Sequence, residues 1–201
     1  MNDVDPVKFL KPPRRHRSKH VLLVLGVAIL GTVGYNAGWF NTPKQFLQQT
    51  QPGLYHVSIF YDGDTIAVNM NGVNEKIRLI GVDTPETHDP RKALQCFGQA
   101  AAVFTKQLIG NSSVRLEADA LSSNRDRYNR LLRYVYLPDG RLVNLEIITQ
   151  GYGFAYTGFP FTKSDQFVAA QTAARQASKG LWHDCQPIKN QYGGYTSNNA
   201  Q

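Results

Sequence analysis

The dipeptide Asn71-Gly72 constrains the fold of this chain more than any other sequence feature. It lies between Thr65–Met70 and Lys76–Ile80, two short segments with the pattern of β-strands. Asn-Gly readily adopts the left-handed backbone of a two-residue hairpin turn, whose twist suits paired antiparallel strands. Because Leu54–Tyr61, just upstream, alternates apolar and polar residues, the sequence predicts a three-stranded meander.

Two further strands and three helices are predicted downstream. Val114–Ala118 and Leu131–Leu137 have the pattern of strands, and a Pro-Asp-Gly turn follows the second. The expected helices are Phe97–Ile109 ending at Gly110, Leu142–Gln150 stopped by Gly151, and Ser164–Ser178 with Ser164 as N-cap and Gly180 as its stop. Five short strands with about three helices favour an α+β fold built on a five-stranded OB-fold β-barrel, a common scaffold for binding nucleic acids.

The N-terminus has the features of an exported protein. Residues 1–20 hold six basic and two acidic residues, and so carry four of the seven excess positive charges of the chain. An uncharged apolar stretch, Val21–Gly34, follows, and aromatic residues extend it to Phe40, about the 20 residues that a bilayer requires. We expect a transmembrane anchor over residues 21–40 with its N-terminus in the cytoplasm, and a cleavable signal peptide or a buried helix are the alternatives. An anchor and a signal peptide both place the rest of the chain outside the cytoplasm.

The remaining sequence divides into three parts. Residues 41–53 are polar with prolines near both ends and are expected to form a linker, residues 54–187 a folded domain, and residues 188–201, rich in Gly, Asn and Gln, a flexible tail. With only two cysteines, the chain is no disulfide-rich scaffold and has no four-thiolate zinc site. In an oxidising compartment Cys96 and Cys185 are expected to pair, and two unpaired cysteines are the alternative.

Acidic residues gather in two turns of the expected meander. Asp62-Gly63-Asp64-Thr65 lies between the first two strands, and Val82-Asp83-Thr84-Pro85-Glu86 directly follows the third. A meander can bring both turns to one end of the sheet, where converging carboxylates favour a cation such as Ca²⁺ or Mg²⁺. The alternative is that each turn is simply solvated, because Asp-Gly is an ordinary turn dipeptide.

Two arginines are expected near the acidic turns. If Ile77 and Leu79 face the core, Arg78 points to the opposite face of its strand, toward the carboxylates. Arg130 ends the loop Asp126–Arg130, just before the fifth strand. Two guanidinium groups facing a metal site suit phosphoryl transfer, because each can bind phosphate oxygens and stabilise the charge that develops on them.

These blocks together resemble the thermonuclease, or staphylococcal nuclease-like, family. The resemblance is carried by Asp62–Thr65, by Ile77–Glu86 and by Asp126–Arg130, and it extends over about Leu54–Trp182. It implies an OB-fold barrel and a hydrolase acting on ester bonds, a thermonuclease-like endonuclease. The implied reaction is the Ca²⁺-dependent cleavage of DNA or RNA at the 5′-O bond, leaving 3′-phosphate ends. We expect the nuclease domain to be monomeric.

The resemblance also implies roles for individual residues. Asp64 and Asp83 are the expected carboxylate ligands of Ca²⁺. Thr84 is expected to add its backbone carbonyl, with Asp62 as outer support. Glu86 is expected to position or deprotonate the attacking water. Arg78 and Arg130 are expected to bind the phosphate.

Further substrate contacts are assigned on weaker grounds. Tyr128 and Tyr156 are candidates to stack on bases or sugars, and Arg91 and Lys92 are candidates for phosphate contacts. Simple packing and a solvated loop are the respective alternatives. A catalytically inactive nuclease-like module that binds nucleic acid or protein is the alternative function. Such a module is expected to lack some catalytic carboxylates or arginines, whereas this sequence has them all.

Overall fold

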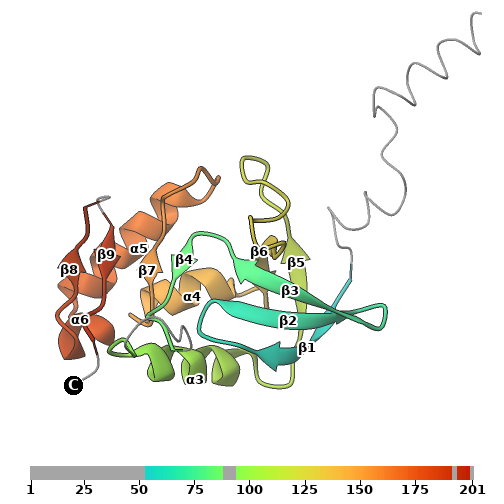
Figure 1. Ribbon diagram of the computed structural model, residues 1–201, viewed down its shortest axis with the longest axis horizontal. Helices are drawn as coiled ribbons and strands as arrows, with labels where there is room; N and C mark the ends of the chain where they lie inside the picture. The colour runs from blue at the N-terminus through green and yellow to red at the C-terminus, as the bar shows by residue number, and fades with distance from the viewer. Residues whose placement is uncertain (1–52, 88–93, 192–193, 200–201) are drawn as a thin grey trace, which may run out of the picture. The chain divides into compact units, whose positions relative to one another are not determined.

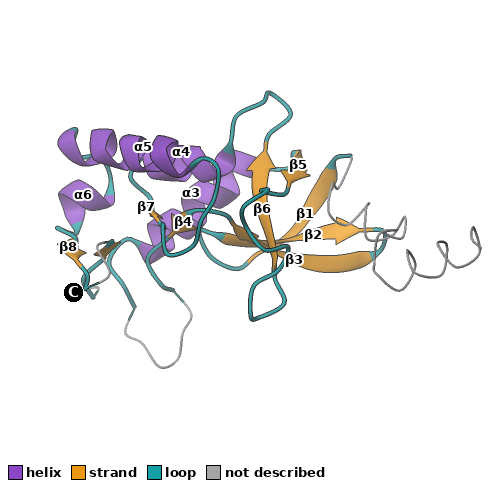
Figure 2. Ribbon diagram, turned by 90° about the horizontal axis from the view of Figure 1, so that it is seen from above, coloured by secondary structure: helices purple, strands orange, loops and turns teal. Residues whose placement is uncertain are grey.

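A closed five-stranded barrel lies at one end of the described part of the chain, and the helices lie at the other (Figures 1 and 2). The computed structural model describes residues 53–87, 94–191 and 194–199. The barrel strands are β1 (Tyr55–Phe60), β2 (Thr65–Met70), β3 (Val73–Leu79), β5 (Ser113–Glu117) and β6 (Leu131–Tyr136). Their order around the barrel is β1-β2-β3-β6-β5, and β5 pairs with β1 to close it. The predicted α+β fold with an OB-type barrel is confirmed.

The meander forms as expected, and its bounds differ most at the start of β3. Asn71 and Gly72 have φ angles of 54° and 84°, the left-handed conformation that a two-residue hairpin turn requires. β2 and β3 pair along their whole length, from Thr65 opposite Arg78 to Met70 opposite Val73. β3 therefore begins at Val73, three residues before the predicted start, because the tight turn leaves no residues for a longer loop.

Four helices accompany the barrel in the described residues: α3 (Gly98–Ile109), α4 (Val143–Thr149), α5 (Ser164–Gln176) and the short α6 (Leu181–Asp184). The N-cap prediction for Ser164 was wrong. Lys163 is the N-cap of α5, and no side chain caps the helix. α5 ends at Gln176, and Gly180, with a φ of 50°, precedes α6 instead of stopping α5. Gly110 ends α3 as expected.

The core fills the barrel and the space between the barrel and α4. Its fully buried side chains include Ile66, Val68, Ile77, Leu79, Val114, Leu131, Val135, Ile147 and Phe167. Asn144 of α4 is also fully buried. Its side chain accepts a hydrogen bond from the Val135 N–H and donates to the carbonyl oxygens of Ile80 and Arg133. This amide therefore fixes α4 against β6 and the end of β3 with both of its polar atoms partnered.

Short strand pairs complete the fold beside the barrel. β4 (Val82–Asp83) pairs with β7 (Phe154–Ala155), which places the second acidic turn next to the chain that follows α4. β8 (Ile188–Lys189) pairs with β9 (Tyr195–Thr196) in the segment expected to be an irregular tail. Tyr195 packs against the ring of Trp182, which explains why this polar segment folds back on α6.

A disulfide links Cys96, just before α3, to Cys185 at the end of α6. It closes a loop with a sequence separation of 89 residues. In the described residues, no helix combines the length and the apolar character needed to cross a bilayer. The expected anchor at 21–40 and nearly all of the linker at 41–53 lie outside the described residues.

Candidate active site

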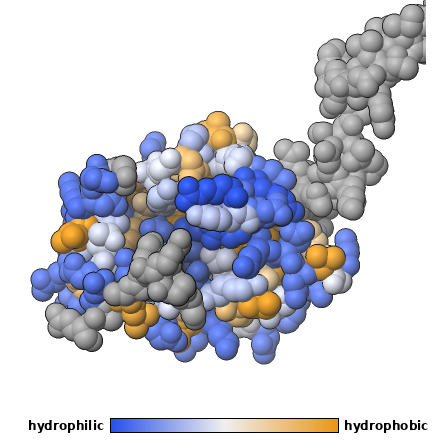
Figure 3. Space-filling model, viewed as in Figure 1, coloured by the Kyte–Doolittle hydropathy of each residue, from blue (hydrophilic) through white to orange (hydrophobic). Residues whose placement is uncertain are grey.

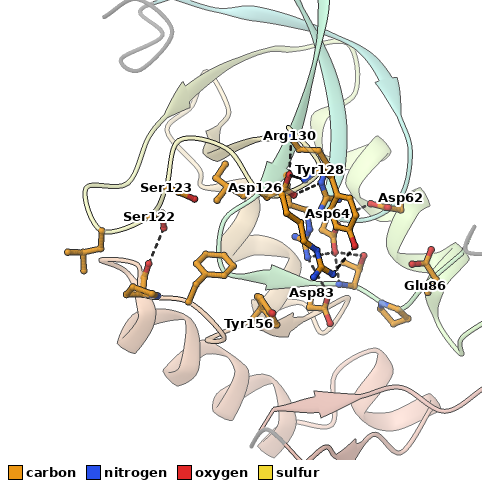
Figure 4. Close-up of a pocket in the computed structure, with 18 residues that line it drawn as sticks. Asp62, Asp64, Asp83, Glu86, Ser122, Ser123, Asp126, Tyr128, Arg130 and Tyr156 are labelled. Carbon is orange, nitrogen blue, oxygen red and sulfur yellow. Dashed lines mark hydrogen bonds and ion pairs between the residues drawn. The ribbon is translucent and has the colours of Figure 1, made fainter. Parts of the chain in front are cut away.

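A groove of about 1090 Å³ opens beside the barrel, and the predicted site residues gather in it (Figure 4). It is lined by nine of them: Asp62, Asp64, Arg78, Asp83, Thr84, Glu86, Tyr128, Arg130 and Tyr156. Arg91 and Lys92 lie outside the described residues. Strongly hydrophilic side chains gather on the molecular face over β3, β4 and the loop before β6 (Figure 3).

The turn between β1 and β2 presents the first carboxylates. The Tyr61 N–H donates to the carbonyl oxygen of Thr65, and the Asp64 N–H donates to Oδ1 of Asp62. Gly63 lies at the centre of the turn, where a Cβ atom would come within 2.7 Å of Cγ2 of Thr84. A side chain at this position would therefore push the two acidic turns apart.

Asp64 connects the two turns. Its Oδ2 atom accepts hydrogen bonds from the Thr84 N–H at 2.9 Å and from the Thr84 hydroxyl at 3.1 Å. Its Oδ1 atom accepts from the hydroxyl of Thr65 at 2.9 Å. Only 8% of the Asp64 side chain is exposed. The meander thus holds this carboxylate rigidly at the point where β2 begins and β4 ends.

Arg78 lies between two carboxylates. Its Nη2 atom is 3.2 Å from Oδ2 of Asp64 and 3.3 Å from Oδ1 of Asp83. Its Nη1 atom donates to the carbonyl oxygens of Leu79 and Val82. Burial by itself lowers the pKa of this guanidinium, but the charges of Asp64 and Asp83 outweigh burial and raise the pKa. As alternation predicts, Arg78 faces the groove while Ile77 and Leu79 face the core.

Negative charge is concentrated around Asp62. Burial, together with the charge of Asp64, raises the pKa of Asp62 to about 7. The hydrogen bond from the Asp64 N–H and the charge of Arg78 act in the opposite direction. Carboxylates this close together favour a bound cation, because the cation removes their mutual repulsion.

Arg130 is held by a carboxylate of its own loop. Its Nε atom is 2.7 Å from Oδ2 of Asp126, and Oδ1 of Asp126 accepts the N–H groups of Tyr128 and Arg130. Asn129 takes a left-handed φ of 65°, which lets the loop turn tightly around this carboxylate. The Nη1 atom of Arg130 lies 3.4 Å from the hydroxyl of Thr65. Both arginines therefore point toward the Asp64 end of the groove.

Tyr128 and Tyr156 lie on the walls of the groove. Tyr128 is 64% exposed, and the guanidinium groups of Arg127 and Arg130 lie 4.8 and 5.5 Å from its ring centroid. Tyr156 is 43% exposed, and its N–H donates to the carbonyl oxygen of Gly81. Exposed rings can stack on nucleobases, and at Tyr128 the neighbouring arginines could contact phosphates at the same time.

Glu86 lies at the end of the groove nearest Asp62, and Ser122 and Ser123 lie at the other (Figure 4). The Glu86 N–H donates to Oε1 of Gln95 at 2.7 Å. Its own Oε1 atom accepts the N–H of Thr87 at 2.9 Å. The carboxylate is therefore oriented by the backbone of its own turn.

Two parts of the groove and one residue outside it were not predicted from the sequence. Asp126 received no role, because a four-residue spacing brings two side chains together in a helix and residues 126–130 form a loop. Gln95 was also overlooked, and its separation from Glu86 offered no local signal. The far end of the groove is formed by Leu121, Ser122, Ser123, Phe159 and Pro160. These come from two distant loops, which only the folded chain brings together.

A barrel that holds carboxylates and two arginines in one groove, flanked by exposed tyrosines, defines a class of protein: a hydrolytic nuclease of the OB-barrel type. The family described as staphylococcal nuclease homologue matches residues 76–184, and the chain belongs to this family. The match includes Arg78, Asp83, Glu86 and Arg130, whereas Asp62 and Asp64 precede it.

Similar curated proteins agree with this assignment. The chain is 34% identical over 162 residues to the thermonuclease of Staphylococcus intermedius, covering 80% of this chain and 95% of that protein. It is 38% identical over 164 residues to the thermonuclease of Staphylococcus hyicus, covering 80% and 90%. It is 38% identical over 123 residues to the endonuclease YncB of Bacillus subtilis strain 168, covering 60% and 57%.

Proposed function

We propose that this protein is a calcium-dependent endonuclease that hydrolyses phosphodiester bonds of DNA, RNA or both, cleaving the 5′-O bond and leaving 3′-phosphate ends. The observation that carries the proposal is the placement of Arg78 between Asp64 and Asp83, 3.2 and 3.3 Å from their carboxylates. A cation at the carboxylates would free this guanidinium to bind a phosphate oxygen. The alternative of an inactive binding module is not favoured.

The donor atoms of the groove fit calcium. Asp64 and Asp83 supply carboxylate oxygens and Thr84 a backbone carbonyl, the hard oxygen ligands that Ca²⁺ prefers. In the described residues, no three His, Cys, Asp or Glu side chains already form a ready metal-binding cluster. The proposed site therefore depends on two carboxylates, a carbonyl and water. A bound Ca²⁺ would supply Lewis acidity at the phosphate and orient the substrate.

The chain's own groups account for the remaining steps. Arg78 and Arg130 bind the non-bridging oxygens of the scissile phosphate and stabilise the charge that accumulates on them during attack. Glu86 holds the attacking water or accepts its proton. Tyr128 and Tyr156 stack on the flanking nucleotides. The bases of a single strand are free to stack on both rings, whereas the bases of a duplex stack on one another, so we expect faster cleavage of single-stranded than of duplex substrate.

The test uses the full-length chain, purified in detergent that keeps the apolar N-terminal segment in solution. Plasmid DNA and RNA are incubated with Ca²⁺, with Mg²⁺ or with EGTA, and product ends are mapped with and without phosphatase. We expect Ca²⁺-dependent cleavage and 3′ ends that support extension by polymerase only after phosphatase treatment. Glu86→Ser should lower the rate by at least about 100-fold, and Glu117→Ser on β5 is the matched control. Cleavage that persists in EGTA or in Glu86→Ser would contradict the proposal.

We further propose that the nuclease domain lies outside the cytoplasm, anchored by residues 21–40 or released by cleavage after them. The basic N-terminus before an apolar segment supports this, and so does the Cys96–Cys185 disulfide, because disulfides persist mainly in oxidising compartments. Protease added to intact cells should digest the domain if it is anchored, and culture supernatant should contain it if it is released. Protection from protease without release would contradict export.

A further inference from the structure

Gln95 forms hydrogen bonds with both polar groups of the Glu86 backbone, its N–H and its carbonyl oxygen. The Glu86 N–H donates to Oε1 of Gln95 at 2.7 Å, and the Gln95 N–H donates to the carbonyl oxygen of Glu86 at 3.1 Å. These two bonds hold Glu86 and Gln95 together. Gln95 does not line the groove, so its contacts act on Glu86 and not on the substrate.

Gln95 is itself fixed by its covalent neighbour. Cys96 forms the disulfide with Cys185, and its N–H donates to the carbonyl oxygen of Asn198 at 2.8 Å. The carbonyl oxygen of Cys96 accepts the hydroxyl of Ser197 at 2.7 Å.

The last described residues, 197–199, form what we call the C-terminal strap. Asn199 of the strap forms an isolated antiparallel β-bridge with Gln95. The side chain of Asn198 donates a hydrogen bond to the carbonyl oxygen of Cys185 at 2.9 Å. Ser197, the first residue of the strap, is 5% exposed, so this end of the strap is packed into the domain. The segment that carries Gln95 is thus held by one covalent bond and several hydrogen bonds.

The first residue of α3 packs closely against the backbone of Glu86. A Cβ atom at Gly98 would lie 2.9 Å from the carbonyl oxygen of Glu86 and 3.0 Å from that of Pro85. The Glu86 turn therefore sits directly against a helix whose first residues follow the disulfide. A displacement of Cys96 would also move Gln95 and Gly98, and both of these residues contact the backbone of Glu86.

We propose that Gln95 is a positioning residue for Glu86, and that the Cys96–Cys185 disulfide and the C-terminal strap hold Gln95 in place, so that catalytic rate depends on the oxidised disulfide. The inference rests on the proposed nuclease activity and on the role of Glu86 in it. A general base or water-orienting group must be placed within a fraction of an ångström, and small misplacements carry large rate losses. The loss is therefore expected in kcat and not in KM.

The first experiment replaces Gln95 in the full-length chain. Gln95→Leu keeps the size of the side chain and removes the oxygen that accepts the Glu86 N–H, whereas Gln95→Glu keeps such an oxygen. Gln99→Leu, at an exposed position of α3, is the matched control. We expect Gln95→Leu to lower kcat about tenfold with KM for DNA unchanged. Gln95→Glu should restore most of kcat, and Gln99→Leu should match the parent protein.

The second experiment removes the disulfide by Cys96→Ala/Cys185→Ala, and separately reduces the parent protein with dithiothreitol. All rates are measured well below the unfolding temperature of each protein, so that loss of stability does not contribute. Each treatment should lower kcat about as much as Gln95→Leu does. Combining Gln95→Leu with the double alanine variant should lower kcat less than about twofold further, because both changes act on one pathway to Glu86.

The outcomes separate this inference from the proposed function. If the parent protein cleaves DNA but Gln95→Leu has an unchanged kcat, or raises KM alone, Gln95 is not a positioning residue. If the disulfide-free protein keeps its full kcat, or if the two changes multiply, the disulfide and strap do not act through Gln95. A parent protein without nuclease activity overturns the proposed function, and this inference with it.

Discussion

Asp64 and Thr84, twenty positions apart in the sequence, share two hydrogen bonds of 2.9 and 3.1 Å to a single carboxylate oxygen. These bonds join the turn after β1 to the segment that follows β4, and they orient Asp64 toward Arg78. One contact thus converts two ordinary acidic turns into one site.

Thr84→Val tests the hydrogen bond from the Thr84 hydroxyl to Oδ2 of Asp64. Valine keeps the shape of threonine but removes the hydroxyl that donates to Asp64, while the backbone N–H still donates. We expect a loss of about 1 kcal/mol in the free energy of unfolding. We also expect weaker activation by Ca²⁺, because Asp64 is held less firmly. Urea unfolding and a calcium titration of nuclease activity measure the two effects, and an unchanged calcium midpoint would show that the hydroxyl does not orient this carboxylate.

Asp126→Asn tests how Arg130 is positioned. The asparagine can still accept the N–H groups of Tyr128 and Arg130 but loses the charge that pairs with the Arg130 side chain at 2.7 Å. Freed from this pair, Arg130 should sample other conformers, and kcat should fall roughly tenfold or more. Asp139→Asn is the matched control, since Asp139 forms an exposed pair with Arg141 away from the groove. Equal rates for both variants would contradict the positioning role of Asp126.

The hydrogen bonds of Asp119 lead us to expect that the free energy of unfolding depends on pH. Its carboxylate accepts hydrogen bonds from the backbone and hydroxyl of Thr162, the hydroxyl of Tyr134 and the N–H of Leu121. Burial alone raises the pKa of Asp119, but these bonds outweigh burial and lower the pKa from the ordinary 3.8 to about 2. Because the folded-state pKa is depressed, the stabilisation is present above pH 4 and is lost as the pH falls toward 2.

The Asp119→Asn variant tests the direction of this pH dependence. At pH 7 we expect the variant to lose about 2 kcal/mol in the free energy of unfolding, because hydrogen bonds to a charged acceptor are replaced by neutral ones. The difference between variant and parent should shrink as the pH falls from 4 toward 2, where the parent carboxylate is protonated. Urea unfolding at pH 7 and pH 3 measures both values. A difference that grows on acidification would contradict the assignment.

Gly63→Ala tests the close approach of the two turns. The new methyl group would lie 2.7 Å from Cγ2 of Thr84 and 3.0 Å from Cβ of Ala101. Overpacking of this kind costs about 1–3 kcal/mol, and here it also displaces Asp64, so both stability and activity should fall. In the control Gly140→Ala, no atom lies within 4 Å but φ is +87°. The control should lose stability and keep its activity. Full activity in Gly63→Ala would show that the site tolerates the shift.

Most of the fold and the centre of the site followed from local signals. The hairpin at Asn71-Gly72, the alternation that turns Arg78 away from the core and the helix-ending Gly110 each act over a few residues, where backbone sterics decide the outcome. The ends of the elements were less certain. Ser164 was expected to cap α5, yet Lys163 takes that position, because the packing of Phe167 and its neighbours sets where the helix begins, not capping preference alone.

The set of reactive groups and the strands that carry them follow from the sequence alone, because residue type and alternation are local properties. Which distant groups meet depends on the folded chain. The strap at residues 197–199, which contacts Cys96, and the far wall of the groove at Ser122 and Pro160 join segments far apart in the chain. The two bonds between Gln95 and Glu86, nine positions apart, also have no signal in the local sequence. The contacts of the strap and of the far wall depend on how the whole barrel closes and on what packs against it, and no short stretch of sequence encodes that.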